Sequence, residues 1–243
     1  MSIWGKLLAG TFGFALGGPI GAMLGVIAGH SVDRIRNQKS DSNIASNSPQ
    51  EIITIGIIIL AAKLAKADGQ VTTDEISAFK EKFKIPPDFQ SDVSKIFNEA
   101  KKNSDDYHQY AQQIGMLFRG QPQVLEQILN LLFYIAEADG EVSEAELRMI
   151  EHIAQIFGLN KFQFNGIKES RKSSDKLNPY IVLESRPEDD LQTIRKKYLK
   201  LSKEHHPDLL ISKGVPKEVI EESKNKMRAI NSAWDKIQKL KSN

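Results

Sequence analysis

Hydrophobic and polar positions divide the chain into regions with different patterns. The first region contains an uncharged run from Leu7 to Ala28, in which Thr11 is the only clearly polar side chain. Beyond it, apolar residues recur at helical spacing and no strand-like alternation is sustained. The sequence therefore predicts an all-α protein. Its predicted parts are a glycine-rich membrane anchor at 1–36, a polar linker at 37–49, a helical domain at 50–172 and a second helical domain at 173–243.

The uncharged run predicts a single transmembrane helix. About 22 residues at about 1.5 Å each give roughly 33 Å, which is enough to cross a hydrocarbon core of about 30 Å. Trp4 and Lys6 lie at one edge, and the other edge carries more positive charge, from Arg34, Arg36 and Lys39. The positive-inside bias then places the N-terminus outside and the following domains in the cytoplasm. A cleaved signal peptide that ends at Val26-Ile27-Ala28 is the alternative.

Glycine recurs every four residues in this segment, at Gly17, Gly21, Gly25 and Gly29. These positions share one face of a helix and let another backbone approach closely, so they predict a homodimer through the transmembrane helix. The alternative is a span of small residues without a specific partner, and Pro19 weighs against a straight interface.

Helical patterns fill the middle region. The expected helices are 50–67, 73–84, 88–102, 105–119, 122–138, 144–157 and 160–170. The apolar run from Ile52 to Ala65 is too short to span a membrane and carries Lys63, which indicates a buried core helix.

Residues 67–76 and 138–147 are similar to each other: each ends an apolar helix, turns at glycine and begins another helix. Thr72 with Glu75, and Ser143 with Glu146, have the spacing of capping boxes. These turns resemble the TerB-like domain, and that resemblance implies a divalent metal held by acidic residues, here Asp68, Glu75, Asp139 and Glu146. Oxygen ligands would suit calcium or magnesium. The alternative is that the aspartates shape the turns and the glutamates cap helices.

Composition narrows the function. Lysine and arginine number 33 against 31 aspartates and glutamates, so no overall field favours nucleic acid. There is no cysteine, which excludes disulfides and thiolate chemistry. No nucleophile–base pair, phosphate loop or metal triad is evident, so the chain is not expected to be an enzyme, nor to need a cofactor apart from the metal just described.

The C-terminal region carries the strongest signal. A helix places Leu191, Ile194, Tyr198 and Leu201 on one face and stops at His205-His206-Pro207-Asp208, which contains the tripeptide His206-Pro207-Asp208. Its other faces carry the basic residues Arg195, Lys196, Lys197, Lys200 and Lys203. A last helix after Pro216 has an apolar stripe of Ile220, Met227, Ile230, Ala233, Trp234 and Ile237.

Two antiparallel helices joined through His-Pro-Asp resemble the J domain. The resemblance implies that the basic helix and the tripeptide bind a DnaK-type chaperone and stimulate its ATP hydrolysis. The partner-binding residues are then His206, Pro207, Asp208, Arg195, Lys196, Tyr198, Lys200 and Lys203. Leu199, Glu204 and Leu209 depart from the usual pattern and put affinity or partner choice in question. The alternatives are a solvated basic face, or one that attracts phosphate or anionic lipid, beside an ordinary turn.

The order of the parts resembles the DnaJ-like co-chaperones of the bacterial inner membrane. Trp4-Gly5-Lys6 opens the chain, a glycine-rich span ends at Gly29-His30, and a TerB-like region precedes the J domain. The expected protein is a single-pass co-chaperone. A membrane adaptor or sensor, whose TerB-like domain binds metal or a client and whose J domain is secondary, is the other hypothesis.

Overall fold

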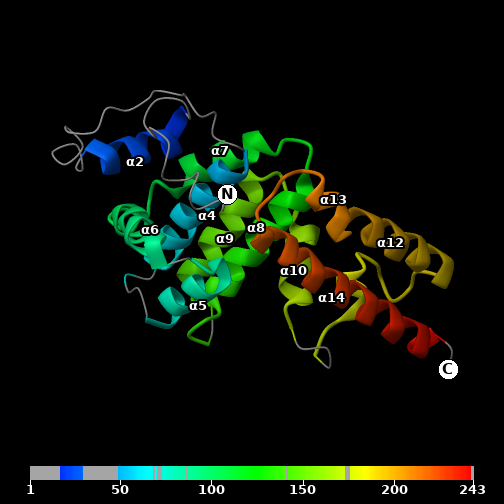
Figure 1. Cartoon of the computed structure of the whole chain (residues 1–243). Coiled ribbons are helices and arrows are strands. Elements are labelled where there is room, and N and C mark those ends of the chain that lie inside the picture. Colours follow the sequence, from blue (N-terminus) through cyan, green and yellow to red (C-terminus); the bar gives the residue numbers. More distant parts are fainter. Residues whose placement is uncertain are drawn as a thin grey trace. The chain divides into compact units, whose positions relative to one another are not determined.

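The computed structural model describes residues 17–29, 49–67, 69, 73–85, 87–140, 142–172 and 176–241. Within these ranges all regular secondary structure is helical (Figure 1), which confirms the predicted all-α class. The chain folds into two compact units. The N-terminal unit holds the described residues up to Leu117 and residues 132–153, and the C-terminal unit holds residues 118–131 and the described residues from Ala154 on.

The N-terminal unit is built around one apolar helix. Its helices are α2 (Gly18–Gly29), α4 (Pro49–Leu64), α5 (Thr73–Phe83), α6 (Pro87–Ala100), α7 (Tyr107–Leu117), the end of α8 (Pro122–Ala136) and most of α9 (Glu144–Ile156). Helix α4 packs against α6 and α7. Every α4 side chain from Ile53 on is buried, as expected of a helix that is apolar on all sides. The predicted buried core helix is confirmed.

Helix α2 packs on α6 and α7 of the same unit. Its side chains Ile20, Met23 and Leu24 are buried, and the Ile20 amide donates to Gln113 Oε1 at 2.9 Å. Gly17 precedes the helix with φ +55°, a left-handed conformation that favours glycine. Of the predicted glycine face, Gly21, Gly25 and Gly29 therefore lie in α2, and Gly17 lies just before it.

The C-terminal unit contains the start of α8, the end of α9, α10 (Lys161–Ser170), α11 (Pro179–Val182), α12 (Leu191–Glu204), α13 (Pro207–Ile211) and α14 (Lys217–Lys241). Helices α12 and α14 pack against each other (Figure 1). They run antiparallel, because Tyr198 contacts Asn231 while Lys241 reaches the Asp189 carbonyl before α12. Helices α11 and α13 both pack on α14.

The core of this unit is the one that the apolar stripes predicted. Its buried members are Leu177, Val182, Leu183, Ile194, Leu201, Ala229, Ile230, Ala233 and Ile237. The rings of Tyr198 and Trp234 stack beside them, with centroids 5.1 Å apart and an interplanar angle of 11°. Leu191 differs from its predicted place on the apolar face, since 41% of it is exposed at the first position of α12.

Candidate functional site

The tripeptide His206-Pro207-Asp208 begins a short helix. His206 is the N-cap of α13, and its Nδ1 accepts from the Asp208 amide at 3.3 Å. Pro207 occupies the first helical position, where a missing N–H costs nothing and the fixed φ suits a helix. The side chains of His206 and Asp208 are 54% and 82% exposed. The motif therefore presents an imidazole and a carboxylate to solvent from a defined backbone.

The residue before the motif is held differently. His205 caps the C-terminus of α12 and is 4% exposed. Its Nε2 lies 3.1 Å from Glu126 Oε2, and its Nδ1 lies 3.5 Å from Gln127 Nε2. Both partners are buried residues at the start of α8, within the C-terminal unit.

The His205–Glu126 contact is buried, and burial disfavours the charged form of both groups. Burial first, and then the cation of Lys226, lower the pKa of His205 to about 3. Burial also raises the pKa of Glu126, against the opposing effect of Lys226. A neutral imidazole has one donor and one acceptor nitrogen. With Nδ1 accepting from the Gln127 amide, the proton is on Nε2, the nitrogen that faces the Glu126 carboxyl group at 3.1 Å.

The sequence pattern did not predict this contact. His205 was expected only as the end of a helix, although Ile194, Tyr198, Leu201 and His205 continue one helical face at 3/4 spacing. That periodicity could have predicted the burial of His205. No local signal pointed to Glu126, since the contacting pair is 79 positions apart in the chain.

The predicted basic face is only partly free. Arg195, Lys196 and Lys203 are exposed. Lys197 donates to Asp189 at 2.8 Å, and this hydrogen bond is the main cause that lowers the pKa of Asp189. Lys200 Nζ lies 3.9 Å from Glu204. Lys197 therefore pairs with a residue just before its own helix, and Arg195, Lys196 and Lys203 are the cations most available to a partner.

Tyr198, predicted to bind a partner, contributes mainly to packing. Its ring is partly buried against Trp234, and its hydroxyl donates to Asn231 Oδ1 at 3.3 Å. Two of the residues that depart from the J pattern are exposed instead: Leu199 to 54% and Leu209 to 38%. The surface of α12 and α13 thus combines cations with apolar side chains around the tripeptide.

The predicted metal ligands occupy different environments. Glu146 is buried and completes a capping box with Ser143: its Oε2 accepts from the Ser143 amide at 2.9 Å, and Ser143 Oγ accepts from the Glu146 amide at 3.2 Å. Glu75 is buried and Asp139 is exposed, while Asp68 lies outside the described residues. Among the side chains that the structure describes, no group of three histidines or carboxylates is placed to hold a metal ion.

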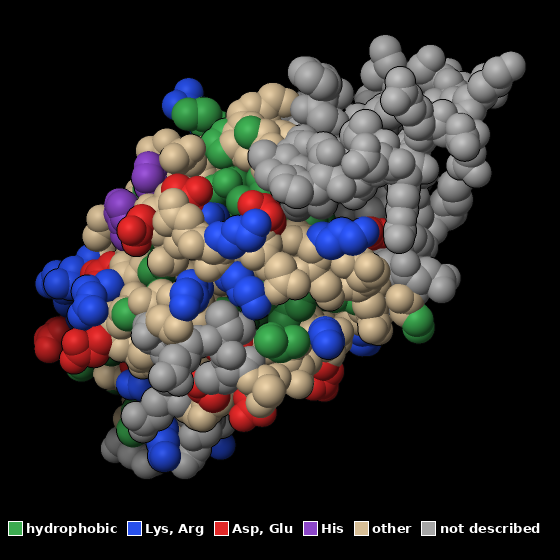
Figure 2. All heavy atoms as spheres, turned by 90° about the vertical axis from the view of Figure 1, so that its left-hand side faces the viewer, with side chains coloured by type: hydrophobic (Ala, Val, Ile, Leu, Met, Phe, Trp, Pro, Cys, Tyr) green, Lys and Arg blue, Asp and Glu red, His purple; other side chains and the backbone are tan. Residues whose placement is uncertain are grey.

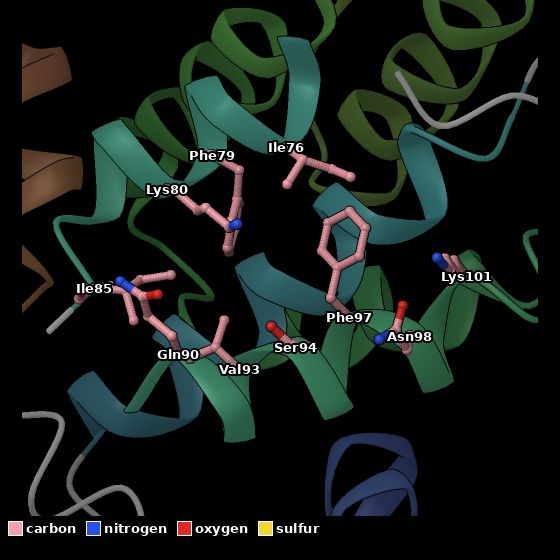
Figure 3. A pocket seen from close by; sticks show the side chains of 10 residues that line it. All are labelled: Ile76, Phe79, Lys80, Ile85, Gln90, Val93, Ser94, Phe97, Asn98 and Lys101. Carbon is pink, nitrogen blue, oxygen red and sulfur yellow. Dashed lines mark hydrogen bonds between the residues drawn. The ribbon is translucent and has the colours of Figure 1, made fainter. Parts of the chain in front are cut away.

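A hollow of about 220 Å³ lies between α5 and α6 (Figure 3). Phe79 and Phe97 form its apolar wall with centroids 5.6 Å apart, and Lys80 and Lys101 also line it. No carboxylate is part of the lining. The hollow therefore suits an apolar group with an anionic end better than a cation.

The predicted membrane span lies partly outside the described residues, which begin at Gly17. Among the helices that are described, none has the length and apolar character needed to cross a bilayer. On the face of the molecule in Figure 2, lysine and arginine side chains are interspersed with aspartate and glutamate, in keeping with the near balance of charge.

The chain is similar in sequence to known proteins. Residues 54–169 match the family of the tellurite resistance protein TerB, and residues 1–47 match the co-chaperone DjlA transmembrane domain. The chain is 26% identical to the co-chaperone protein DjlA of Photorhabdus laumondii, with 99% of both chains covered. It is 27% identical to that of Photobacterium profundum, over 98% of this chain and 99% of the relative. With DjlA of Escherichia coli K12 the identity is 24%, over 99% of both chains. No solved structure matches.

These matches confirm the resemblance that the sequence predicted. The TerB match falls on the region of the repeated turns, and the full-length similarity extends through the helices that carry His206-Pro207-Asp208. The match at residues 1–47 supports a membrane-anchored protein.

Proposed function

We propose that this DjlA-like chain is a membrane-anchored J-domain co-chaperone, which recruits a DnaK-type chaperone and stimulates its ATP hydrolysis. The observation that carries the proposal is the exposed His206-Pro207-Asp208 motif at the start of α13, beside the cations of α12. The chain acts as a regulator of a partner ATPase, and the chemistry takes place on the partner.

Each part of the surface has a role in this proposal. The Asp208 carboxylate is 82% exposed and accepts a bidentate arginine from the partner. Pro207 and the cap at His206 fix the backbone beforehand, so less conformational entropy is lost on binding. Arg195, Lys196 and Lys203 attract an acidic groove and speed the encounter.

We place the protein in the bacterial inner membrane as a single-pass protein, with the N-terminus outside and the helical domains in the cytoplasm. The charge asymmetry around the uncharged run supports this orientation. Pairing through Gly17, Gly21, Gly25 and Gly29 would make it a homodimer in the lipid bilayer, and it requires α2 to leave the place on α6 and α7 that it occupies in this structure. Nucleic acid is not among its expected partners.

Two substitutions test the function. His206→Gln and Asp208→Asn in the full-length protein in detergent should abolish stimulation of the DnaK-type ATPase in single-turnover assays, because both side chains are exposed contacts. Circular dichroism should show an unchanged helical fold. Asp235→Asn, which alters another exposed carboxylate on α14, is the matched control and should stimulate normally. Full stimulation by either folded motif variant would overturn the proposal.

The second candidate function is that of a membrane adaptor or sensor. The hollow between α5 and α6 supports its client-binding form, because apolar side chains and lysines line it. Ser94→Arg, which fills the hollow, should then release a client captured from membranes, while ATPase stimulation stays intact. The metal-binding form predicts that calcium raises the melting temperature. A titration without any such shift would remove it.

A further inference from the structure

The backbone that presents the His206-Pro207-Asp208 motif is anchored outside the helices that resemble a J domain. The last helical hydrogen bond at the end of α12 joins the His205 amide to the Leu201 carbonyl at 2.9 Å. The chain then turns: His205 has φ −101° and ψ 13°, and His206 has φ −64° and ψ 130°. The His205 side chain at this turn contacts Glu126 and Gln127 of α8.

A buried polar layer fixes the partners of His205. Gln127 presents its amide nitrogen to His205 because its Oε1 accepts from Asn130 Nδ2 at 3.1 Å. The Asn130 carbonyl accepts from Arg171 at 2.9 Å, and Arg171 lies 3.8 Å from Glu222 of α14. Glu126, Gln127 and Asn130 are each less than 5% exposed. The layer therefore links α8 to the end of α12 and to α14 within one compact unit.

Charged groups surround the Glu126–His205 contact. Lys226 of α14 is 5% exposed and its charge acts on both residues. Glu184 after α11 and Glu204 at the end of α12 interact electrostatically with the same group of side chains. Loss of the Glu126 carboxyl group would remove the polar group that faces the buried Nε2 of His205, and a buried polar atom without a polar neighbour is unfavourable. The turn before the motif would relax to let water reach it.

We propose that Glu126 is a positioning residue for the His206-Pro207-Asp208 motif: through its buried contact with His205, at 3.1 Å, it holds the turn from which α13 begins. The contact between Glu126 and His205 is independent of the proposed function, but its biological meaning rests on that function. A segment of the TerB-matching region, at the start of α8, thus becomes part of the co-chaperone machinery. The part of the chain that positions the motif therefore includes the start of α8 as well as the helices that resemble a J domain.

Three variants of the full-length protein in detergent test this. Glu126→Leu removes the acceptor and keeps most of the volume, whereas Glu126→Gln keeps an acceptor oxygen. Leu125→Ala is the matched control, because it removes buried apolar packing from the same helix without removing the polar contact with His205. Hydrogen exchange would be read at the α13 amides of Leu209 and Ser212, which bond to the carbonyls of His206 and Asp208.

We expect these amides to exchange about three- to tenfold faster in Glu126→Leu than in wild type, the effect of losing one buried polar contact. Glu126→Gln should restore the wild-type rate, and Leu125→Ala should leave the rate nearly unchanged. In the ATPase assay, Glu126→Leu should raise the co-chaperone concentration for half-maximal stimulation about fivefold at an unchanged maximal rate, because fewer molecules hold the binding-competent turn.

Other outcomes would contradict either the positioning role of Glu126 or the proposed function. Wild-type exchange in Glu126→Leu, or equal acceleration in Leu125→Ala, would overturn the positioning role, since the effect would then be absent or one of general stability. Faster exchange with unchanged stimulation would also overturn it, because a loosened motif would work as well as a held one. A wild-type chain that stimulates no DnaK-type ATPase would refute the proposed function instead. The exchange comparison would still decide whether Glu126 orders the turn.

Discussion

Replacing Lys63 by methionine should destabilise the N-terminal unit more than any surface substitution. Lys63 lies in α4 with 1% of its side chain exposed. Its ammonium donates to the carbonyls of Asn103 at 2.7 Å and Ala100 at 3.3 Å and to the Asp106 carboxylate. It also lies 4.7 Å from the centre of the Tyr110 ring. Methionine keeps the apolar stem but removes the charge and every donor.

The magnitude follows from these partners. Breaking a buried ion pair by removing one member costs roughly 3–5 kcal/mol. The Asp106 side chain is 27% exposed, so water can solvate it after the change. We therefore expect the lower end, about 3 kcal/mol, which corresponds to a fall in melting temperature of about 6–12 °C for a chain of this size.

Urea and thermal unfolding followed by circular dichroism would measure the effect. Lys63→Met should be combined with Asp106→Asn in a double-mutant cycle, because the neutral pair leaves no charge without a partner. We expect the double variant to lose less stability than the sum of the single variants. A loss below about 1 kcal/mol for Lys63→Met, or strict additivity, would refute the view that the lysine is held by this carboxylate.

Three further outcomes follow from the structure. Charge reversal at Lys196 and Lys200 together should slow association with the partner ATPase in stopped-flow experiments more than it speeds dissociation, and wild-type association should slow as salt rises. Binding that is insensitive to salt would mean that these cations are only solvated. The pKa of His205 falls from 6.5 to about 3 on folding, so below pH 6.5 the imidazole becomes protonated in the unfolded chain while it stays neutral in the folded chain. The free energy of unfolding should therefore drop by about 2 kcal/mol between pH 7 and pH 5 through this residue, and His205→Asn should remove that part of the drop in urea titrations. An identical pH dependence in the variant would contradict the burial of a neutral imidazole. Gly21→Leu with Gly25→Leu should weaken crosslinking between membrane-inserted copies without preventing insertion, and undiminished crosslinking would leave the glycines no role in pairing.

Most of the fold was predictable from the chain alone because its helices carry strong periodicity and clear breaks. The seven helices expected in the middle region all occur, with ends that differ by at most three residues. Helix α13 was not expected, since five residues hold too little periodicity and histidine is not a usual N-cap. The short helix α11, Pro179–Val182, was not predicted either, because four residues show no helical periodicity.

The candidate site was predictable where it depends on local sequence. The resemblance picked out the motif, and the structure adds its exposure and its capped backbone. The engagement of Lys197 by Asp189 and the contact of His205 with Glu126 depend on how helices pack. Lys63 illustrates the same limit: its place in an apolar helix indicated burial, but the carbonyls that satisfy it come from the end of α6 and the segment after it.

The cap at His206 changes how a substitution there should be interpreted. Its Nδ1 accepts a backbone amide, so a neutral ring in this cap has its proton on Nε2 and offers a partner one donor in a fixed direction. Glutamine replaces that donor but is a poor N-cap, so His206→Gln removes a contact and loosens α13 together. Asparagine is among the preferred N-caps yet is too short to reach as far. His206→Asn would keep the N-cap of α13 and lose only the length of the imidazole side chain. Comparing the two variants therefore separates the contact that the ring makes with a partner from its role in capping the helix.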